Sequence, residues 1–285
     1  MRTVPHCLTD RDIRLIALDL DGTTLNSQGV LSEKTIHALN KASKAGITVV
    51  AATGRAFGAM PKEVLDSGAF SYAVTSNGTG IYRLSDQQRI YSKQMSEQNL
   101  ADLLSLLKNY PCPMEVFMDG IAYADARYVK DPLSFHVSER SAAYVKATRT
   151  PISDIPFFIW ENRHRVEGMD IIVTNMELKK EIRDQAAKIP NLYITSSVSQ
   201  YVEFAAEGAT KETALAHLAS LLSIDPGQII AFGDGENDLE MLRFSGIGVA
   251  VENACPLLKE HADFITESND MDGVANALRK ILENR

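Results

Sequence analysis

Two carboxylates stand two residues apart at the end of an apolar run near the start of the chain. The segment Ile13–Leu25 reads IRLIALDLDGTTL, and Asp19 and Asp21 end its apolar part. Such a run is typical of a strand that is buried on both faces of a parallel sheet. Because ligands bind beyond the carboxyl ends of such strands, both acids are candidates for catalysis.

Three further groups of polar residues follow other predicted strands or begin a helix. They are Thr53-Gly54-Arg55, Lys211, and the run GDGEND from Gly233 to Asp238. A Thr-Gly pair or a single lysine is most often an ordinary surface feature. The GDGEND run is more informative, because its two glycines allow close backbone approach and it carries three polar groups at one strand end. A calcium loop is not indicated, because the full pattern of such a loop is missing.

Together these groups suit phosphoryl transfer. That reaction needs a nucleophile in line with the phosphorus, a divalent cation on the phosphate oxygens, and positive or N–H donors around them. Asp19 could be the nucleophile, since carboxylates form aspartyl-phosphates. Asp21 could protonate the leaving oxygen and later take a proton from water. Asp19, Asp234 and a backbone carbonyl near Asp21 would suit Mg²⁺, which offsets repulsion between carboxylate and phosphate.

Order and spacing give these segments a resemblance to the four motifs of the haloacid dehalogenase-like phosphatases, in the Cof-type branch with a class IIB cap domain. DLDGTTL resembles the first motif, AATGR the second, Lys211 in GATKETAL the third, and GDGENDLEML the fourth. TSNGTGIY and the segment 248–278 also match. The middle third resembles the family only in position, size and hairpin-helix character.

The resemblance implies a role for each matching residue. Asp19 would be the nucleophile and a metal ligand, and Asp21 the acid and base, binding the metal through its carbonyl. Asp234 would be the third protein ligand of Mg²⁺, and Asp238 would belong to the metal site or support Lys211, itself expected to be catalytic. The residues expected to bind phosphate or substrate are Leu20, Thr53, Gly54, Asn77, Gly78, Lys211 and Asn237. The presence of Asp21 favours phosphate esters over halides, because a halide leaves without a proton.

Strand and helix patterns alternate at both ends of the chain. Such alternation predicts an α/β fold with a Rossmann-like, doubly wound parallel sheet, to which both ends contribute. The expected strands are 13–20, 47–52, 72–76, 228–233, 248–251 and 263–266, and the expected helices are 32–46, 59–67, 209–222, 237–244, 256–261 and 273–283.

The middle of the chain follows another pattern, with hairpins and mixed helices and strands. We expect an inserted α+β domain over 92–198 that sets substrate specificity, and a catalytic core over 1–91 and 199–285. Tyr123 and Tyr128 are expected to serve packing more than substrate stacking, and 162–165 is expected to be a solvated loop. The expected strands are 80–83, 89–93, 114–118, 121–123, 157–160, 169–174 and 191–196, the expected helices are 97–109 and 177–188, and Phe157, Phe158 and Trp160 are expected in the domain's core.

Composition limits the classes of protein that the chain can represent. Its 285 residues are 45% hydrophobic, and 29 basic against 37 acidic residues give a net charge of −8, which argues against non-specific nucleic-acid binding. Cys7, Cys112 and Cys255 are expected to be reduced thiols. No signal peptide or membrane-spanning run is visible, so we expect a cytoplasmic protein, a monomer or weak homodimer, without membrane partners.

The sequence therefore predicts an Mg²⁺-dependent phosphatase that acts on small soluble phosphomonoesters, such as sugar phosphates, through an aspartyl-phosphate. Two alternatives stay open. One is a phosphomutase that uses the same phosphorylated Asp19, and the other is a non-catalytic scaffold that binds a phosphorylated ligand. The substrate itself is not readable, because specificity is expected to lie in the middle domain.

Overall fold

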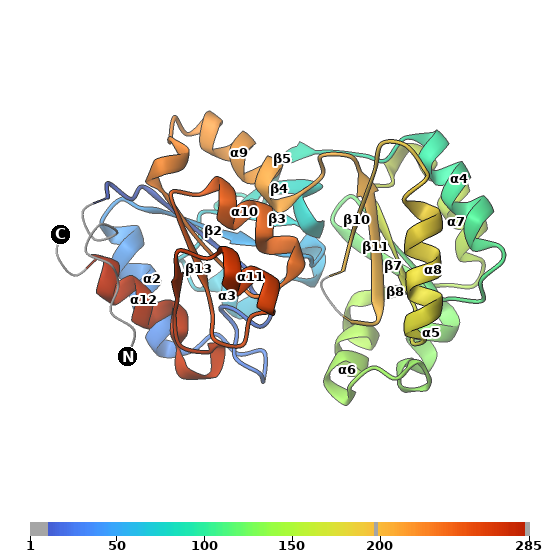
Figure 1. Cartoon of the computed structure of the whole chain (residues 1–285), viewed down its shortest axis with the longest axis horizontal. Helices are drawn as coiled ribbons and strands as arrows, with labels where there is room; N and C mark the ends of the chain where they lie inside the picture. The colour runs from blue at the N-terminus through green and yellow to red at the C-terminus, as the bar shows by residue number, and fades with distance from the viewer. Residues whose placement is uncertain (1–10, 197–198, 283–285) are drawn as a thin grey trace. The chain divides into compact units, whose positions relative to one another are not determined.

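The computed structural model describes residues 11–196 and 199–282 and divides the chain into two compact units (Figure 1). The first unit comprises the chain up to Gly54, Met60–Tyr91 and everything from Thr210 onward. The second comprises Arg55–Ala59 and Ser92–Ala209. Cys112 and Cys255 are free thiols, whereas Cys7 lies outside the described residues.

An eight-stranded sheet forms the centre of the first unit, in the order β14-β13-β12-β1-β2-β3-β4-β5. The pairs from β14 to β3 are parallel, and β4 pairs with β3 in the antiparallel direction. Both ends of the chain contribute strands, as the sequence predicts. The strands are β1 (Leu15–Leu18), β2 (Thr48–Ala52), β3 (Tyr72–Thr75), β4 (Gly80–Arg83), β5 (Gln88–Ser92), β12 (Ile229–Gly233), β13 (Ile247–Ala250) and β14 (Phe264–Ile265).

Strand β1 is central, and all four of its residues are buried. Leu15 and Ala17 belong to a core that includes Leu215 and Leu218 of α9. Because side chains alternate along a strand, Ile16 and Leu18 point to the opposite face. The sheet is thus buried on both faces, which explains the nearly continuous apolar run.

Helices cover this sheet, and side-chain caps fix where two of them begin. The Ser32 side chain accepts a hydrogen bond from the Thr35 N–H at the start of α2. Thr210 and Thr213 form reciprocal side-chain-to-backbone hydrogen bonds at the start of α9. The helices are α2 (Glu33–Lys44), α3 (Lys62–Asp66), α9 (Lys211–Leu221), α10 (Leu239–Phe244), α11 (Pro256–His261) and α12 (Gly273–Leu282).

The second unit contains a six-stranded sheet in the order β10-β11-β9-β6-β7-β8. Its strand pairs are antiparallel except β7 with β8, so the α+β prediction for this region is confirmed. The elements are α4 (Glu97–Leu107), β6 (Met114–Met118), β7 (Ile121–Asp125), α5 (Ala126–Lys130), α6 (Glu139–Thr148), β8 (Arg149–Ile152), α7 (Ile155–Glu161), β9 (Gly168–Ile172), α8 (Met176–Ala186), β10 (Leu192–Thr195) and β11 (Tyr201–Ala206).

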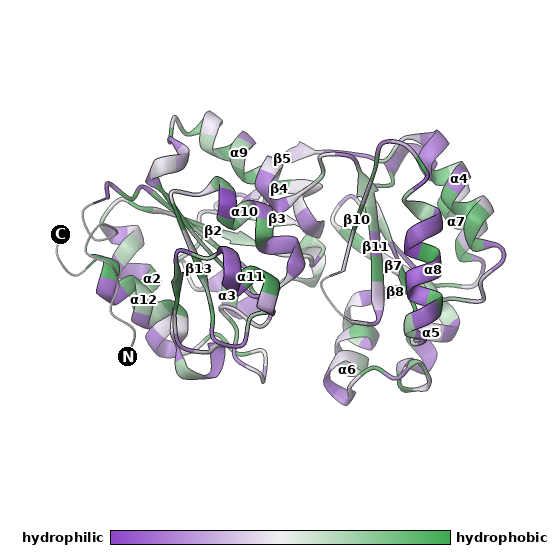
Figure 2. Cartoon of the chain, in the orientation of Figure 1, coloured by the Kyte–Doolittle hydropathy of each residue, from purple (hydrophilic) through white to green (hydrophobic). Residues whose placement is uncertain are grey.

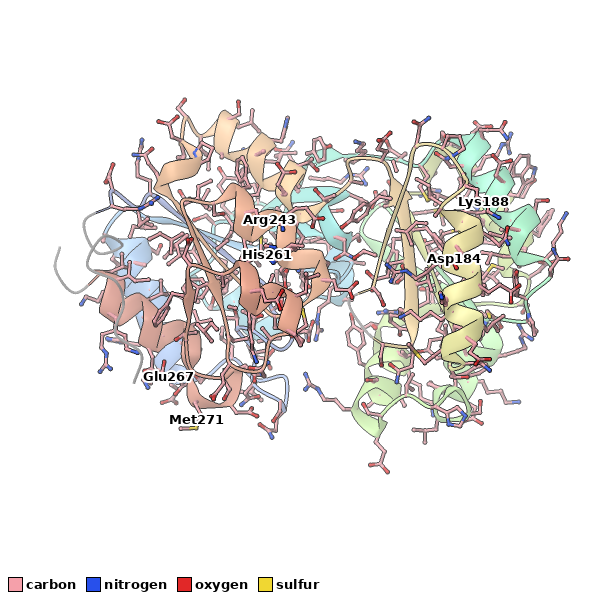
Figure 3. The ribbon with its side chains drawn as sticks, viewed as in Figure 1. Asp184, Lys188, Arg243, His261, Glu267 and Met271 are labelled. Atoms are coloured by element: carbon pink, nitrogen blue, oxygen red, sulfur yellow. The ribbon has the colours of Figure 1, made fainter. Side chains whose placement is uncertain are left out.

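Helices α4, α7 and α8 share one apolar core with residues of this sheet. The predicted leucine stripe of α4 is confirmed, since Leu100, Leu103 and Leu107 are buried there. Hydrophilic and hydrophobic bands alternate along α8 (Figure 2). Asp184 is an exposed position of α8, and the exposed Lys188 follows the end of the helix; Figure 3 labels both.

The prediction of a strand at 157–160 is wrong, because this segment lies in helix α7. The Asp154 side chain accepts a hydrogen bond from the Phe157 N–H, and Pro156 occupies the first turn, where proline suits a helix. Ile155 and Ile159, one turn apart, provide the buried face. Phe157 and Trp160 are instead 62% and 40% exposed, so their predicted place in the core is also wrong.

Two limits of the predicted inserted domain need correction. The second unit continues to Ala209, because β11 pairs with β9 and β10; the predicted limit at 198 falls on a residue outside the described part. The short segment Arg55–Ala59 also belongs to this unit. Strand β11 was not among the expected strands, although it pairs with its sequence neighbour β10.

Three expectations about individual side chains of the second unit can be compared with the structure. Tyr128 is fully buried and its hydroxyl lies 2.9 Å from that of Tyr201. Tyr123 packs against Phe158. Both tyrosines thus serve packing, as expected. The segment 162–165 is a short turn whose arginines form exposed ion pairs with Glu97 and Asp119.

Among the described residues, no helix combines the length and the apolar composition that crossing a membrane requires.

Candidate active site

Parallel pairing brings the polar residues after β1 and β12 to the same edge of the first sheet. Leu18 is the register partner of Phe232, and the Asp19 N–H donates to the Phe232 carbonyl at 3.0 Å. Asp19 and Asp234 therefore follow neighbouring strand ends, although they are far apart in sequence. Thr53 follows β2, the other neighbour of β1.

Lys211 lies between two acids. Its Nζ is 2.7 Å from Asp19 Oδ1 and 2.6 Å from Asp238 Oδ1, and its side chain is fully buried. Burial by itself would lower the pKa of Lys211, but Asp19 and Asp238 outweigh it and raise the pKa above its ordinary value. The lysine is thus held charged beside Asp19.

The Asp238 carboxylate supports the loop after β12 as well as Lys211. Its Oδ2 accepts hydrogen bonds from the Asp234 and Gly235 N–H groups, both at 3.0 Å. A Cβ at Gly233 would come within 2.4 Å of the Asp238 Cβ, so this position requires glycine. Both Asp238 oxygens are engaged within the protein, which suits a residue that positions its neighbours.

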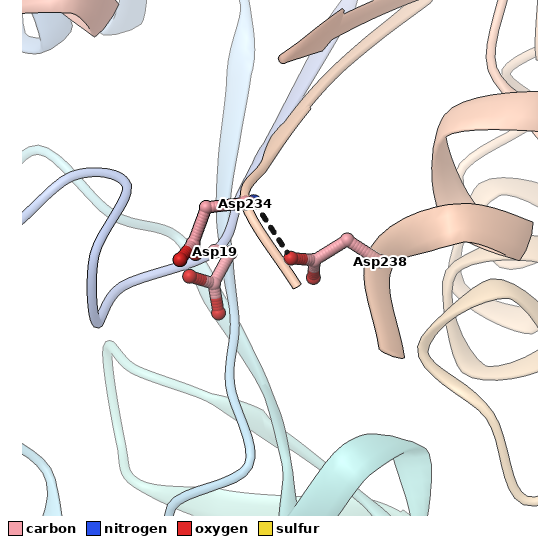
Figure 4. A group of neighbouring side chains, drawn as sticks. All are labelled: Asp19, Asp234 and Asp238. Carbon is pink, nitrogen blue, oxygen red and sulfur yellow. Dashed lines mark hydrogen bonds between the residues drawn. The ribbon is translucent and has the colours of Figure 1, made fainter. Parts of the chain in front are cut away.

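Asp19, Asp234 and Asp238 each offer a carboxylate oxygen within 4.8 Å of the others. Figure 4 shows the side chains of Asp19 and Asp234 next to each other, with Asp238 bonded to the Asp234 backbone. Asp19 Oδ2 is buried and receives no hydrogen bond from the described residues. We call this group, with Lys211, the core acid cluster.

The pKa values of the cluster reflect its crowding. Burial raises the pKa of Asp19 well above its usual range; Lys211 opposes this rise, and Asp238 and Asp234 reinforce it. Burial, and then Asp238, raise the pKa of Asp234 to about 6. A divalent cation would relieve the repulsion between these carboxylates. The unpartnered oxygen of Asp19 and the adjacent Asp234 carboxylate therefore fit a site for a divalent cation.

The turn after β1 is built around Gly22. Its φ of +81° is in the left-handed region, and a Cβ there would come within 2.5 Å of Asp234 Oδ2. The Thr23 hydroxyl donates to Asp234 Oδ1 at 2.8 Å, and the Thr24 hydroxyl donates to the Asp19 carbonyl at 2.5 Å. Asp21 is exposed beside this turn, where its carboxyl group is accessible to solvent.

The sequence predicts that Leu20 is one of the phosphate-binding residues. Its side chain is fully buried, and its carbonyl accepts the N–H groups of Thr24 and Leu25. Only its backbone N–H could therefore serve a ligand.

The loop after β3 joins the predicted phosphate-binding residues. The Asn77 N–H donates to the Thr53 carbonyl at 3.1 Å, and Asn237 Nδ2 donates to Asn77 Oδ1 at 2.9 Å. A Cβ at Gly54 would lie 3.2 Å from the same Asn77 oxygen. The structure thus brings Thr53, Gly54, Asn77 and Asn237 together.

The backbone of this loop is strained. Ser76 and Asn77 have φ values of +46° and +56°, which cost free energy for residues other than glycine and are common at functional sites. Gly78 has φ +106°, and a Cβ there would lie 2.0 Å from the Thr210 carbonyl. Its glycine is therefore required for packing against the start of α9, whatever its part in binding.

Three site residues received no separate role from the sequence. Thr23 and Thr24 stood within the first motif, and Asn253, whose Nδ2 donates to the Gly22 carbonyl at 2.7 Å, stood within a matching stretch. Only their contacts in the folded protein distinguish these three residues from the polar residues that surround them in the sequence.

A family model for haloacid dehalogenase-like hydrolases matches residues 16–278 of the chain. A phosphatase of Bacillus subtilis, YwtE, is 30% identical over 293 residues, which cover 96% of this chain and 99% of that protein. It is named a 5-amino-6-(5-phospho-D-ribitylamino)uracil phosphatase.

Solved structures show the same fold. A haloacid dehalogenase-like hydrolase from B. subtilis superposes with a TM-score of 0.83 at 25% identity, over 95% of this chain and all of that one. BT4131, described as a sugar phosphatase of subclass IIB, gives a TM-score of 0.78 at 23% identity, over 93% and 98% of the two chains.

The chain belongs to the haloacid dehalogenase-like hydrolase family, in its Cof-type branch with the subclass IIB fold. Several of its curated relatives are named phosphatases, and the chain is an enzyme of this class, a phosphoric monoester hydrolase.

Proposed function

We propose that the protein is an Mg²⁺-dependent phosphatase that hydrolyses small phosphomonoesters through a phosphorylated Asp19. The observation that carries the proposal is the asymmetry of the Asp19 carboxylate. Lys211 holds Oδ1 at 2.7 Å, while the buried Oδ2 receives no hydrogen bond from the described residues. One oxygen is thus fixed, and the other is available to attack phosphorus.

In the first step, Asp19 Oδ2 forms a bond to phosphorus and the bond to the ester oxygen breaks. Asp21 donates its proton to that oxygen, so the product leaves as a neutral alcohol. In the second step, the Asp21 carboxylate takes a proton from water, whose oxygen attacks phosphorus. The bond from phosphorus to Asp19 breaks, which releases phosphate and restores the carboxylate.

The other residues of the site would bind the metal or the phosphate, or position the residues that do so. Asp19, Asp234 and the Asp21 carbonyl would hold Mg²⁺, which supplies positive charge to the phosphate oxygens and offsets their repulsion from Asp19. Thr53, Gly54 and Asn237 would bind the phosphate, and Asn77 would orient Asn237. Asp238, whose two oxygens are engaged, would position Lys211 and the Asp234 loop.

The second unit would select the organic part of the substrate. The substrate class proposed from the relatives is a small phosphorylated metabolite, since one is named for a phosphoribitylamino compound and another is described as a sugar phosphatase.

Phosphate release across a broad panel of phosphomonoesters, with Mg²⁺, tests the proposal. We expect release of free phosphate without an isomerised ester, and loss of that activity with EDTA that Mg²⁺ restores. Asp19→Asn should lower turnover by about four orders of magnitude or more, since it removes the nucleophile. Asp66→Asn, at an exposed position of the same unit, is the matched control.

Several outcomes would contradict the proposal. Substantial turnover by a folded Asp19→Asn protein would exclude the covalent route. Activity that resists EDTA would exclude the metal, and an isomerised phosphate ester would indicate a mutase. No release from any ester by the wild-type protein would favour a binding role.

A further inference from the structure

A cavity lies in the second unit beside helices α4 and α7, and none of its lining residues belongs to the candidate active site. Its volume is about 570 Å³, within the range of about 300–1,000 Å³ that is usual for sites that bind small molecules. All the lining residues fall between Ala101 and Trp160, inside one compact unit. The cavity is therefore a feature of the second unit by itself.

The buried part of the lining belongs to a fixed apolar core. Leu107 on α4, Met114 on β6 and Ile155 on α7 line the cavity and are buried. The same three side chains belong to the core that α4, α7 and α8 share with the sheet. Because close-packed core side chains hold one arrangement, these residues give the cavity a preformed apolar surface.

Two aromatic side chains of the lining are held in place by polar partners. The Tyr110 hydroxyl donates to Glu181 Oε1 on α8 at 2.8 Å. The Arg163 guanidinium lies over the Trp160 ring, 4.7 Å from its centroid, although Trp160 stays 40% exposed. Rings that are already ordered can pack against a planar aromatic ligand at low entropic cost. The lining therefore favours an aromatic ligand.

The charged side chains around the cavity balance one another. The lining residues that the structure describes include two cations and two anions, which are Lys108, Arg127, Asp125 and Asp154. Asp125 is ion-paired with Arg127, and Asp154 Oδ1 accepts the Phe157 N–H at 3.1 Å. No net positive charge is thus left for an anion, and a charged ligand would lose hydration without gaining an equivalent partner.

We propose that this cavity binds a small uncharged aromatic molecule, which is different from a phosphorylated substrate. The core residues supply apolar surface, and Tyr110 and Trp160 supply rings for packing. The balanced charges disfavour anions. A molecule that binds only the folded cavity stabilises the second unit. The proposal also gives a role to the exposed Trp160, which lies outside the core that the sequence predicts for it.

Two probes with the same ring system test the inference. They are 2-naphthol, which is uncharged at neutral pH, and 2-naphthalenesulfonate, which is an anion. Trp160 is the only tryptophan of the chain, so its indole N–H gives a single NMR signal in protein labelled with nitrogen-15. We expect 2-naphthol to shift this signal saturably, and the sulfonate to bind about tenfold more weakly or worse.

Variants of the lining should weaken the binding of 2-naphthol. Ser105 is an exposed lining residue on α4, so Ser105→Phe fills part of the cavity without disturbing the core and should raise the Kd about tenfold or more. Trp160→Ala removes an aromatic wall and should raise the Kd in calorimetric titration. Gln98→Phe, at an exposed position of α4 outside the lining, is the matched control and should keep the wild-type Kd.

A higher Kd in at least one lining variant, with the wild-type Kd in Gln98→Phe, would support the inference. The remaining backbone signals show whether each variant is folded. Absence of a saturable shift of the Trp160 signal would overturn it, as would sulfonate binding that is as tight as naphthol binding. A Kd that both lining variants leave unchanged would place the probe elsewhere and overturn it too. None of these results bears on phosphate release, so the phosphatase proposal is tested separately.

Discussion

The two units each contain three neighbouring carboxylates and a buried cation, but they arrange them differently. In the second unit, Asp170 on β9 is the register partner of Glu115 on β6 and of Glu203 on β11. We call these three acids the acid row, and Arg149 is ion-paired to Glu115 at one end of it. In the core acid cluster, the acids follow strand ends, where loop N–H groups are available; Asp238 accepts two of them at 3.0 Å. In the acid row, the acids lie within strands, whose N–H groups take part in the sheet. Their charge must therefore be balanced by side chains, protons or ligands.

The position of the cation also differs. Lys211 contacts two acids of the core acid cluster, so it fixes Asp19 on one side while the other oxygen stays available. Arg149 instead forms a two-pronged ion pair with Glu115, at one end of the acid row. The lysine thus links two acids of one cluster, whereas the arginine pairs with an acid at the end of a row.

Removing the cation from each unit is the strongest test of this comparison. Lys211→Met and Arg149→Met both leave buried carboxylates unpaired, and each should lower the free energy of unfolding by about 3–5 kcal/mol. Only Lys211→Met should abolish phosphate release from a hydroxyl substrate, because only Lys211 contacts Asp19. Urea denaturation and a phosphate-release assay measure the two effects.

Lys180→Met, at an exposed position, is the control for loss of a lysine. Adding Glu115→Gln to Arg149→Met should restore much of the lost stability, since it removes the unpaired charge. A stable Arg149→Met protein, or an active Lys211→Met protein, would contradict the comparison.

A smaller effect is expected from a substitution that tests metal binding by the core acid cluster. Thr23→Val removes the hydroxyl that donates to Asp234 Oδ1 at 2.8 Å and keeps the shape of the side chain. The Kd for Mg²⁺, from the metal dependence of activity, should rise about tenfold. The exposed Thr174→Val is the control, and an unchanged Kd would show that Thr23 does not orient a ligand.

The smallest expected effect is on the pH dependence of stability, which tests whether Asp170 in the acid row holds a proton. The folded protein holds the Asp170 proton more tightly than the unfolded chain, whose aspartates have a pKa of about 3.9. The stabilisation that this proton provides is complete below the pKa of the unfolded chain. It is lost as the pH rises through the higher pKa of Asp170 in the folded protein. Asp170→Asn cannot ionise, so its Tm should exceed that of the wild type near neutral pH.

The advantage of Asp170→Asn should shrink as the pH falls toward about 4, where Asp170 is protonated in both states. Asp184→Asn should show no such trend. Thermal unfolding across this pH range measures the difference, and a constant difference in Tm would indicate that Asp170 does not hold a proton.

Local pattern explains why much of the first unit could be predicted from the sequence. The apolar runs that end in Asp19, Thr53 and Asp234 mark strands buried on both faces. In the second unit, the short apolar run at 155–160 does not distinguish a strand from a helix. The Asp154 cap and the burial of Ile155 and Ile159 decide for a helix.

The sequence by itself determined which residues of the first unit are the candidates for catalysis, because their types and spacing resemble four motifs of one family. It also determined the alternation of strands and helices that places them at strand ends. Only the tertiary structure decided that Asp238 holds Lys211, and that Glu115, Asp170 and Glu203 form one row. Those acids lie on strands that are distant in sequence, and the register between strands is set by long-range pairing and the burial of one face.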